Sequence, residues 1–216
     1  MNRDDFVKFV SSYQDELVHT LLSWNSLDLM FHRHMIQYLS KAHMIEMYDL
    51  SNAVIEFIIK NKLDNIINIG CGIGLLEHLS LLKNVKIDST EIKYMSIGDN
   101  RLLSNFDPYE VVRNKLNTKV TYWTDSIFSN NFNLDNGKYD YGFLIRYTPL
   151  TEDCKNKQDY ETILNNLKKY INNLIIIDLE SKVPYFLKTF RKGKILKYSL
   201  YNVPLEKFNF SKIKLL

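Results

Sequence analysis

Residues 65–76 read NIINIGCGIGLL, and they are the most informative part of the sequence. The chain has only seven glycines, and three of them, Gly70, Gly72 and Gly74, alternate here between an apolar run and the helix-like segment Leu75–Leu82. Glycine at a strand-to-helix turn supplies left-handed backbone angles or lets a ligand approach the backbone closely. The stretch therefore predicts a nucleotide-type ligand site at the end of a strand.

Strand-like and helix-like segments alternate along the chain after residue 62. Short apolar or alternating runs predict strands, and apolar residues at helical spacing predict helices. The expected strands are Ile66–Ile69, Val85–Thr90, Val120–Trp123, Tyr139–Ile145, Leu174–Ile177, Lys194–Tyr201 and Phe208–Leu215. The expected helices are Leu75–Leu82, Ile92–Ser104, Tyr109–Leu116 (with Asp107-Pro108 as its start), Tyr160–Ile171 and Pro184–Phe190. This alternation predicts an α/β fold with a right-handed, doubly wound sheet.

The N-terminal part of the chain reads as helical. Residues 3–60 contain neither Pro nor Gly, and their apolar residues recur at helical spacing. Ser51 has the residue type of an N-cap for a helix over Asn52–Lys60. We expect one domain, in which residues 1–62 form a helical cap and residues 63–216 form the ligand-binding α/β part.

Composition narrows the class of protein. No apolar run approaches the roughly 18 residues that cross a membrane, and the first residues lack the features of a signal peptide. The two cysteines, Cys71 and Cys154, form neither a disulfide framework nor the spacing of a metal site. We expect a cytoplasmic protein without a structural metal, and nothing in the sequence indicates an oligomeric state.

The charge is distributed unevenly along the chain. Residues 181–216 contain nine Lys and Arg against one acid, a net charge of +8, so the first 180 residues carry −5 of the total of +3. A basic segment with interleaved aromatic residues can bind nucleic acid, which makes RNA a candidate partner. The alternative is a pair of strands whose lysines keep a sheet edge from aggregating.

Polar residues follow the expected strands at the edge where an α/β sheet binds ligands. Asn68 ends the first strand, Glu91 the second, Asp125-Ser126 the third and Arg146-Tyr147 the fourth. A carboxylate in the position of Glu91, beside a glycine turn, can accept hydrogen bonds from ribose hydroxyls. A carboxylate after the third strand can reach the edge of an adenine.

The glycine spacing excludes two common ligand classes. A dinucleotide site needs G-x-G-x-x-G, but Leu75 stands where the third glycine would follow Gly70 and Gly72. A P-loop needs Gly-Lys-Ser/Thr, which the chain lacks here. The turn thus lacks the sequence motifs that bind phosphate groups.

Residues 66–74 resemble the first motif of class I S-adenosylmethionine-dependent methyltransferases. Glu91 resembles the acid of that family that binds ribose, and Asp125-Ser126 the acid on the adenine side. Residues 138–145 are similar to the family's fourth strand, and the likeness extends over roughly residues 63–180. The resemblance implies a mostly parallel, seven-stranded Rossmann-like sheet and transfer of a methyl group from S-adenosylmethionine.

The resemblance also assigns roles to individual residues. Gly70 and Gly72 would let the methionine part of the cofactor approach, Glu91 would hold the ribose, and Asp125 the adenine amino group. The full set of residues implied at the cofactor is Asn68, Gly70, Cys71, Gly72, Gly74, Glu91, Ile92, Asp125, Ser126 and Arg146. Cys71 is expected to be a small packing residue of the turn and not a nucleophile.

The chain departs from the family at Asn68, where the family usually has Asp or Glu. An amide supplies no countercharge, so we expect cofactor binding to be weaker by about 1–2 kcal/mol. The segment after the fourth strand lacks the Asp/Asn-Pro-Pro-Tyr/Phe motif of enzymes that methylate base amines or glutamine amides. The acceptor stays open between a small molecule, a protein side chain and RNA.

No residue stands out as a general base, which is needed only if the acceptor carries a proton. Tyr147, His43 and Glu46 are the candidates. Two alternatives remain beside a methyltransferase. One is another transferase that uses the same cofactor, such as an aminopropyl-type transferase, and the other is a non-catalytic subunit or binding module with this fold.

Overall fold

A computed structural model describes most of the chain. The described residues are 1–22, 40–92, 110–123, 127–134, 137–146, 154, 156–179, 194–196 and 208–214. The expected helix Pro184–Phe190, the helix start Asp107-Pro108 and most of the expected helix Ile92–Ser104 lie outside them.

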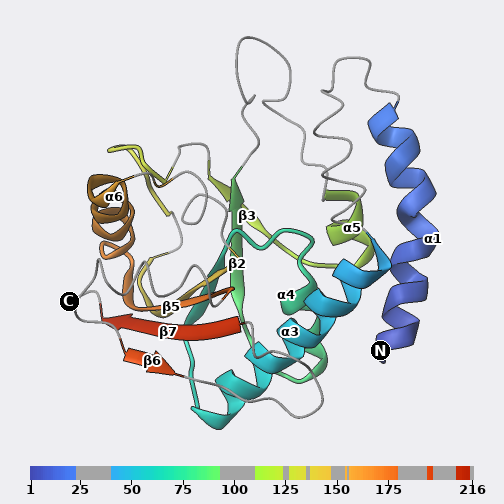
Figure 1. The fold of residues 1–216 in the computed structure, drawn as a ribbon, viewed down its shortest axis with the longest axis horizontal. Coiled ribbons are helices and arrows are strands. Elements are labelled where there is room, and N and C mark those ends of the chain that lie inside the picture. Colours follow the sequence, from blue (N-terminus) through green and yellow to red (C-terminus); the bar gives the residue numbers. More distant parts are fainter. Residues whose placement is uncertain are drawn as a thin grey trace.

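Within the described residues the protein contains one sheet of seven strands in the order β3-β2-β1-β4-β5-β7-β6 (Figure 1). The strands are β1 (Ile66–Ile69), β2 (Asp88–Ile92), β3 (Thr121–Trp123), β4 (Tyr139–Ile145), β5 (Ile171–Leu179), β6 (Lys194–Leu196) and β7 (Phe208–Lys214). Strands β1 to β5 pair in parallel, whereas β7 is antiparallel to both β5 and β6. The predicted doubly wound and mostly parallel α/β architecture is confirmed.

Helices cover both faces of the sheet, which explains why its central strands are apolar on both sides. On one face lie α1 (Arg3–Leu22), α3 (Lys41–Lys60), α4 (Leu75–Leu82) and α5 (Glu110–Lys115), and on the other lies α6 (Lys157–Leu167) (Figure 1). Ile66 faces the α3 and α4 side, and Ile67 faces the α6 side. All four residues of β1 are buried, so this strand is the centre of the core.

Several predicted elements have the observed bounds, and others differ for identifiable reasons. The bounds predicted for β1, α4 and β4 agree with the structure. The sequence pattern predicts the second strand over Val85–Thr90, whereas the strand lies at Asp88–Ile92. Its C-terminal end is later than predicted because Ile92 pairs with Trp123 of β3. Ile92 therefore ends a strand and does not begin a helix.

The predicted helix Tyr160–Ile171 is also displaced. Helix α6 begins after Asn156, whose side chain and that of Asp159 form a reciprocal capping box. It ends at Leu167, and Ile171 already pairs with Tyr139 as the first residue of β5. Tyr170 and Ile171 continue the apolar spacing of the helix, so the sequence pattern alone does not show that the helix ends at Leu167 and that a strand follows.

The N-cap assigned to Ser51 is wrong. Helix α3 runs without interruption from Lys41 to Lys60, and Ser51 lies buried inside it. Its N-cap is Ser40, whose side-chain oxygen accepts a hydrogen bond from the backbone N–H of His43 at 3.3 Å. Ser51 faces the core because it shares a helix face with buried Val54, Ile55 and Ile58.

The N-terminal helices pack on the α/β part of the chain. Helix α1 lies against α3, and α3 lies against α4 (Figure 1). The division at residue 62 into a cap and a ligand-binding part remains a prediction. Among the described residues, no helix has both the length and the apolar character needed to cross a membrane.

Alanine substitutions at Ser40 and Ser51 distinguish the two N-cap assignments by their effect on stability. Ser40→Ala should lower the free energy of unfolding by about 1 kcal/mol, because it removes the side-chain acceptor of the first turn. Ser51→Ala should change it by less than about 0.5 kcal/mol, because alanine is the more favourable residue inside a helix. Urea denaturation measures both, and a larger loss for Ser51→Ala than for Ser40→Ala would contradict the observed start of α3.

Candidate functional site

The glycine turn between β1 and α4 is built from left-handed backbone angles, as its sequence predicts. The φ angles are +75° at Gly70, +56° at Gly72 and +73° at Gly74. The backbone N–H groups of Gly70 and Cys71 both donate to the carbonyl oxygen of Thr90, at 2.9 and 3.2 Å. The turn is therefore attached to the end of β2 as well as to β1.

Gly74 also has no room for a side chain. A Cβ atom at this position would lie 2.7 Å from Thr118 Cγ2 and 3.1 Å from Arg113 Cγ. The Thr118 hydroxyl donates to the carbonyl oxygen of Gly74 at 3.1 Å. The segment after α5 therefore packs directly against the turn and fixes its third glycine.

Gly72 is held from two sides by buried charged residues. Its N–H donates to Glu91 Oε2 at 2.8 Å, and its carbonyl oxygen accepts a hydrogen bond from Arg113 Nη1. Glu91 is 7% exposed and Arg113 is 2% exposed. Glu91 thus lies beside the glycine turn, where the sequence placed it.

Asn68 and Glu77 form a second buried polar contact at this edge. Asn68, in β1, donates from Nδ2 to Oε1 of Glu77, in the first turn of α4, at 2.7 Å. Burial raises the pKa of Glu77 from its ordinary 4.5 to about 7, although the hydrogen bond from Asn68 and the charge of Arg113 act in the opposite direction. A carboxyl group, that of Glu77, thus lies directly beside Asn68, the position where an acid is expected from the resemblance and is absent.

Cys71 lies in the glycine turn near the acids Glu77 and Glu91. Burial raises the pKa of Cys71, and the negative charges of Glu77 and Glu91 raise it further, more than Arg113 lowers it. A protonated thiol is a poor nucleophile. This environment supports the expectation that Cys71 is a packing residue.

Arg146 brings two of the candidate bases to the carboxyl edge. It follows β4 with a φ of +48°, and its N–H donates to the carbonyl oxygen of Ile177 at 2.8 Å. Its Nη1 atom lies 3.5 Å from His43 Nδ1 and 3.7 Å from Glu46 Oε1, both on α3. Because Ile69 of β1 pairs with Leu144 of β4, this cluster lies at the same edge as the glycine turn.

Other candidates lie wholly or partly outside the described part of the chain. Asp125, Ser126 and Tyr147 lie wholly outside it, and of Ile92 only the backbone, at the end of β2, is described. The structure therefore brings together Asn68, the three glycines, Cys71 and Glu91, with Arg146, His43 and Glu46 further along the same edge.

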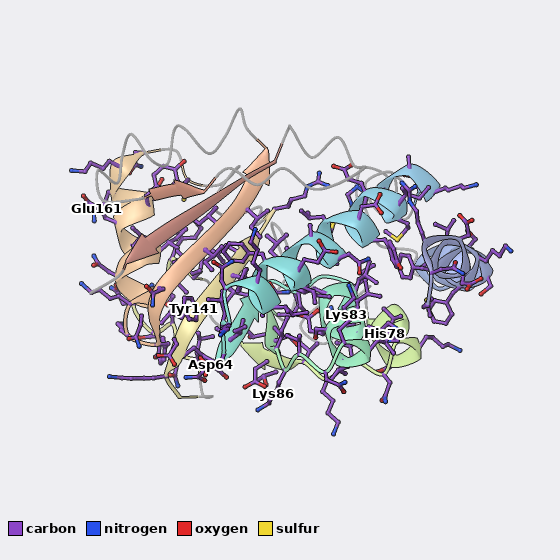
Figure 2. All side chains as sticks on the ribbon, turned by 90° about the horizontal axis from the view of Figure 1, so that it is seen from below. Asp64, His78, Lys83, Lys86, Tyr141 and Glu161 are labelled. Atoms are coloured by element: carbon purple, nitrogen blue, oxygen red, sulfur yellow. The ribbon has the colours of Figure 1, made fainter. Side chains whose placement is uncertain are left out.

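Sequence reasoning missed Glu77, Arg113 and Thr118. Only Glu77 carried a signal, since it is an acid within the apolar helix LLEHLSLL. His78, the next residue, has its Nδ1 atom 2.9 Å from the carbonyl oxygen of Leu116 and is labelled in Figure 2. Arg113 and Thr118 are recognisable only from the packing of α5 against the turn.

A surface cavity of about 400 Å³ lies at the opposite, amino edge of the sheet. Its lining includes Lys62, Asp64, Asn84 and Lys86, of which Asp64 and Lys86 are labelled in Figure 2. Ligands of open α/β sheets bind beyond the carboxyl ends of the strands, so we assign no ligand to this cavity.

Comparisons with known proteins show the fold. No family model and no curated protein matches the sequence. Among solved structures, the methyltransferase domain of bacterial CtHen1 aligns at a TM-score of 0.54 and 11% identity, covering 77% of this chain and 97% of that one. Magnesium protoporphyrin IX methyltransferase (ChlM) from Synechocystis PCC 6803, with bound S-adenosylmethionine, aligns at 0.50 and 10%, covering 98% and 96%.

The glycopeptide N-methyltransferase MtfA aligns at a TM-score of 0.51 and 8% identity, covering 75% of this chain and 88% of that one. The resemblance to class I methyltransferases is thus confirmed at the level of the fold.

The packing at Gly74 predicts a large cost for a small substitution. Gly74→Ala should lower the free energy of unfolding by about 2–4 kcal/mol, from left-handed strain together with overpacking against Thr118. Gly137→Ala is the matched control, because Gly137 has a φ of +89° and nothing within 4 Å of its Cβ position; it should cost only about 1–2 kcal/mol. Equal losses for the two variants would contradict the packing described at the turn.

The raised pKa of Glu77 predicts how stability depends on pH. Between its ordinary 4.5 and about 7, the unfolded chain has released the Glu77 proton and the folded chain has kept it, so this group lowers the free energy of unfolding as pH rises. The stability of Glu77→Gln relative to the wild type should therefore increase by about 2–3 kcal/mol between pH 5 and 8. Urea denaturation at the two pH values tests this, and a difference that does not change with pH would refute it.

Proposed function

We propose that the protein is a methyltransferase that uses S-adenosylmethionine and binds it at the glycine turn. The observation that carries this proposal is the contact between Glu91, at the end of β2, and the N–H of Gly72, within the turn that follows β1. Glu91 is a charged acceptor directly beside an open backbone, at the edge where this class of sheet binds ligands. The likeness of the fold to those of solved methyltransferases also supports the proposal.

The residues of the edge fit the nucleoside part of the cofactor. A carboxylate can accept about four hydrogen bonds, so Glu91 has the capacity to bind a pair of ribose hydroxyls in addition to Gly72. Gly70 and Gly72 have no side chains, so a ligand can approach the backbone of the turn closely at these two positions. Asp125 and Ser126 are proposed to bind the adenine.

The charges of the edge favour a cation over a phosphate. Two buried acids, Glu77 and Glu91, surround the turn, and Arg113 already donates to the carbonyl oxygen of Gly72. An anionic phosphate would meet these carboxylates without a lysine of the P-loop type to bind it. S-adenosylmethionine carries a sulfonium and an ammonium against one carboxylate, so its charge is complementary to the site.

When bound, the cofactor would supply a methyl group already activated by the sulfonium. The protein then needs mainly to align the acceptor and exclude water. Arg146, His43 and Glu46 lie at the same edge and are the proposed lining of the acceptor side, together with Tyr147. A general base among them is required only for an acceptor that carries a proton.

The acceptor is proposed to be a small molecule, a protein side chain or RNA. The basic segment 181–216 supports RNA through its net charge of +8. Its strands β6 and β7 form an antiparallel pair at the end of the sheet, which also suits the alternative in which lysines protect an edge.

The proposal is tested by binding before any acceptor is known. Isothermal titration calorimetry should detect S-adenosylmethionine binding to the wild type, and Glu91→Gln should weaken it about 10- to 100-fold, because a charge-assisted hydrogen bond is lost. Glutamine can still accept from the Gly72 N–H, so the turn should stay folded. Glu161→Gln, an equal charge change on the far side of the sheet (Figure 2), is the control and should bind like the wild type.

Absence of both heat and thermal stabilisation at millimolar cofactor would refute the proposed function. Cofactor binding that Glu91→Gln leaves unchanged would show that the assigned site is wrong. Binding without methyl transfer to any acceptor class would favour the alternatives of a non-catalytic subunit or an aminopropyl-type transferase.

A further inference from the structure

The pair formed by Asn68 and Glu77 has two acceptor atoms left over. Asn68 is 3% exposed and Glu77 is 3% exposed, and the two side chains share one hydrogen bond of 2.7 Å. Within the described part of the chain, neither Asn68 Oδ1 nor Glu77 Oε2 has a hydrogen-bond partner, although both atoms are buried. A buried polar atom left unpaired is destabilising, so two such atoms on one contact call for an explanation.

The direction of the shared hydrogen bond determines what the pair can still bind. The amide nitrogen of Asn68 faces Glu77 Oε1, which is the arrangement that the ionised form of Glu77 requires, because a carboxylate only accepts hydrogen bonds. The amide oxygen therefore points away from Glu77, and the second carboxylate oxygen remains as well. Both leftover atoms are acceptors, so the pair is suited to a group that carries N–H donors.

The surrounding charge favours a positively charged donor. Glu91 adds a second negative charge near Glu77. The guanidinium of Arg113 already donates a hydrogen bond to the carbonyl oxygen of Gly72. A metal ion is not supported, because among the described residues no three His, Cys, Asp or Glu side chains are grouped as metal ligands. A primary ammonium has three N–H donors and one positive charge, which suits two acceptors on a carboxylate–amide pair.

We propose that Asn68 and Glu77 together bind the ammonium of the cofactor's methionine part, with Glu77 supplying the negative charge that Asn68 lacks. This inference rests on the proposed function, since it concerns the same ligand. Glu77 acts here as a binding and positioning residue: it holds the Asn68 amide in one orientation and provides the countercharge. The weaker binding expected from Asn68 alone is then offset by a carboxylate from the next helix.

The pKa of Glu77 gives this proposal a second observable. With a pKa of about 7, Glu77 is partly protonated near neutral pH, and a bound cation would favour its ionised form. Ligand binding should then release a proton, and affinity should fall as pH decreases below 7. A purely structural role for Glu77 would produce neither effect.

The test compares two ligands that differ in the amino acid part. S-adenosylhomocysteine carries the ammonium, and 5′-methylthioadenosine has the same nucleoside without it. Glu77→Gln should weaken the binding of S-adenosylhomocysteine by about tenfold or more, because a charge-assisted hydrogen bond is lost. Its affinity for 5′-methylthioadenosine should stay within about twofold of that of the wild type. Glu161→Gln is the control for net charge and should change neither affinity.

A double variant tests whether the carboxylate must stand at residue 77 or only be present in the pair. Asn68→Asp combined with Glu77→Gln moves the carboxylate to β1 and leaves the amide on α4. It should restore the affinity for S-adenosylhomocysteine to within about threefold of the wild type, because a carboxylate and an amide again face the ligand. Failure to recover any of the lost affinity would contradict the proposed role.

Calorimetry on the wild type keeps the proposal testable if Glu77→Gln does not fold. Titrations at pH 7 in buffers of different ionisation enthalpy should show proton release with S-adenosylhomocysteine and none with 5′-methylthioadenosine. The role of Glu77 would be overturned if Glu77→Gln lost equal affinity for both ligands or lost affinity for neither. It would also be overturned if both ligands released the same number of protons from the wild type. If neither ligand binds the wild type, the proposed function itself fails.

Discussion

The position of the Gly72 residue is the constraint on which the rest of the site depends. Its N–H is bound by Glu91 from the end of β2, and its carbonyl oxygen by Arg113 from α5. These two charged side chains are buried, and a hydrogen bond to a charged group typically contributes about 1.5–3 kcal/mol. The turn is therefore tied to a strand on one side and to a helix on the other, and its three left-handed glycines are held in place before any ligand arrives.

The same arrangement leaves the edge of the sheet with an excess of acceptors. Arg113 is committed to the turn, whereas Glu77 and Glu91 both lie beside it. Burial dominates the pKa of Glu77 and raises it to about 7 in spite of the hydrogen bond from Asn68. The site thus keeps a carboxyl group that is close to ionising, and a cationic ligand is the class of molecule that would stabilise its charged form.

The fold was predictable from the sequence to the extent that local patterns determine it. The apolar run Ile66–Ile69 and the leucine pattern of Leu75–Leu82 gave elements with the observed bounds. The end of β2 at Ile92 was not predictable, because it depends on pairing with Trp123, about thirty residues further on. The residue type of Ser51 suits an N-cap, but the helix continues through this position.

Two parts of the site were predictable from the sequence. Gly72 is a glycine at a turn that needs a left-handed backbone angle, and Glu91 stands at the end of a strand. Glu77 was missed because an acid in the first turn of a helix is also common at the surface, where the helix dipole favours it. Arg113 was missed for a related reason, since a basic residue in the last turn of a short helix usually faces solvent. Only the packing of α4 and α5 beneath the turn makes these two residues part of the site.

The location of the ligand is the central claim, and an NMR titration tests it most directly. Uniformly ¹⁵N-labelled protein would be titrated with S-adenosylhomocysteine, and the backbone amide signals followed residue by residue. If the ligand binds at the glycine turn, the largest shifts will occur at Gly70, Gly72 and Gly74 and at the end of β2 around Glu91. Shifts confined to the cavity at the amino edge, around Lys62 and Asn84, or no shifts at all would contradict it.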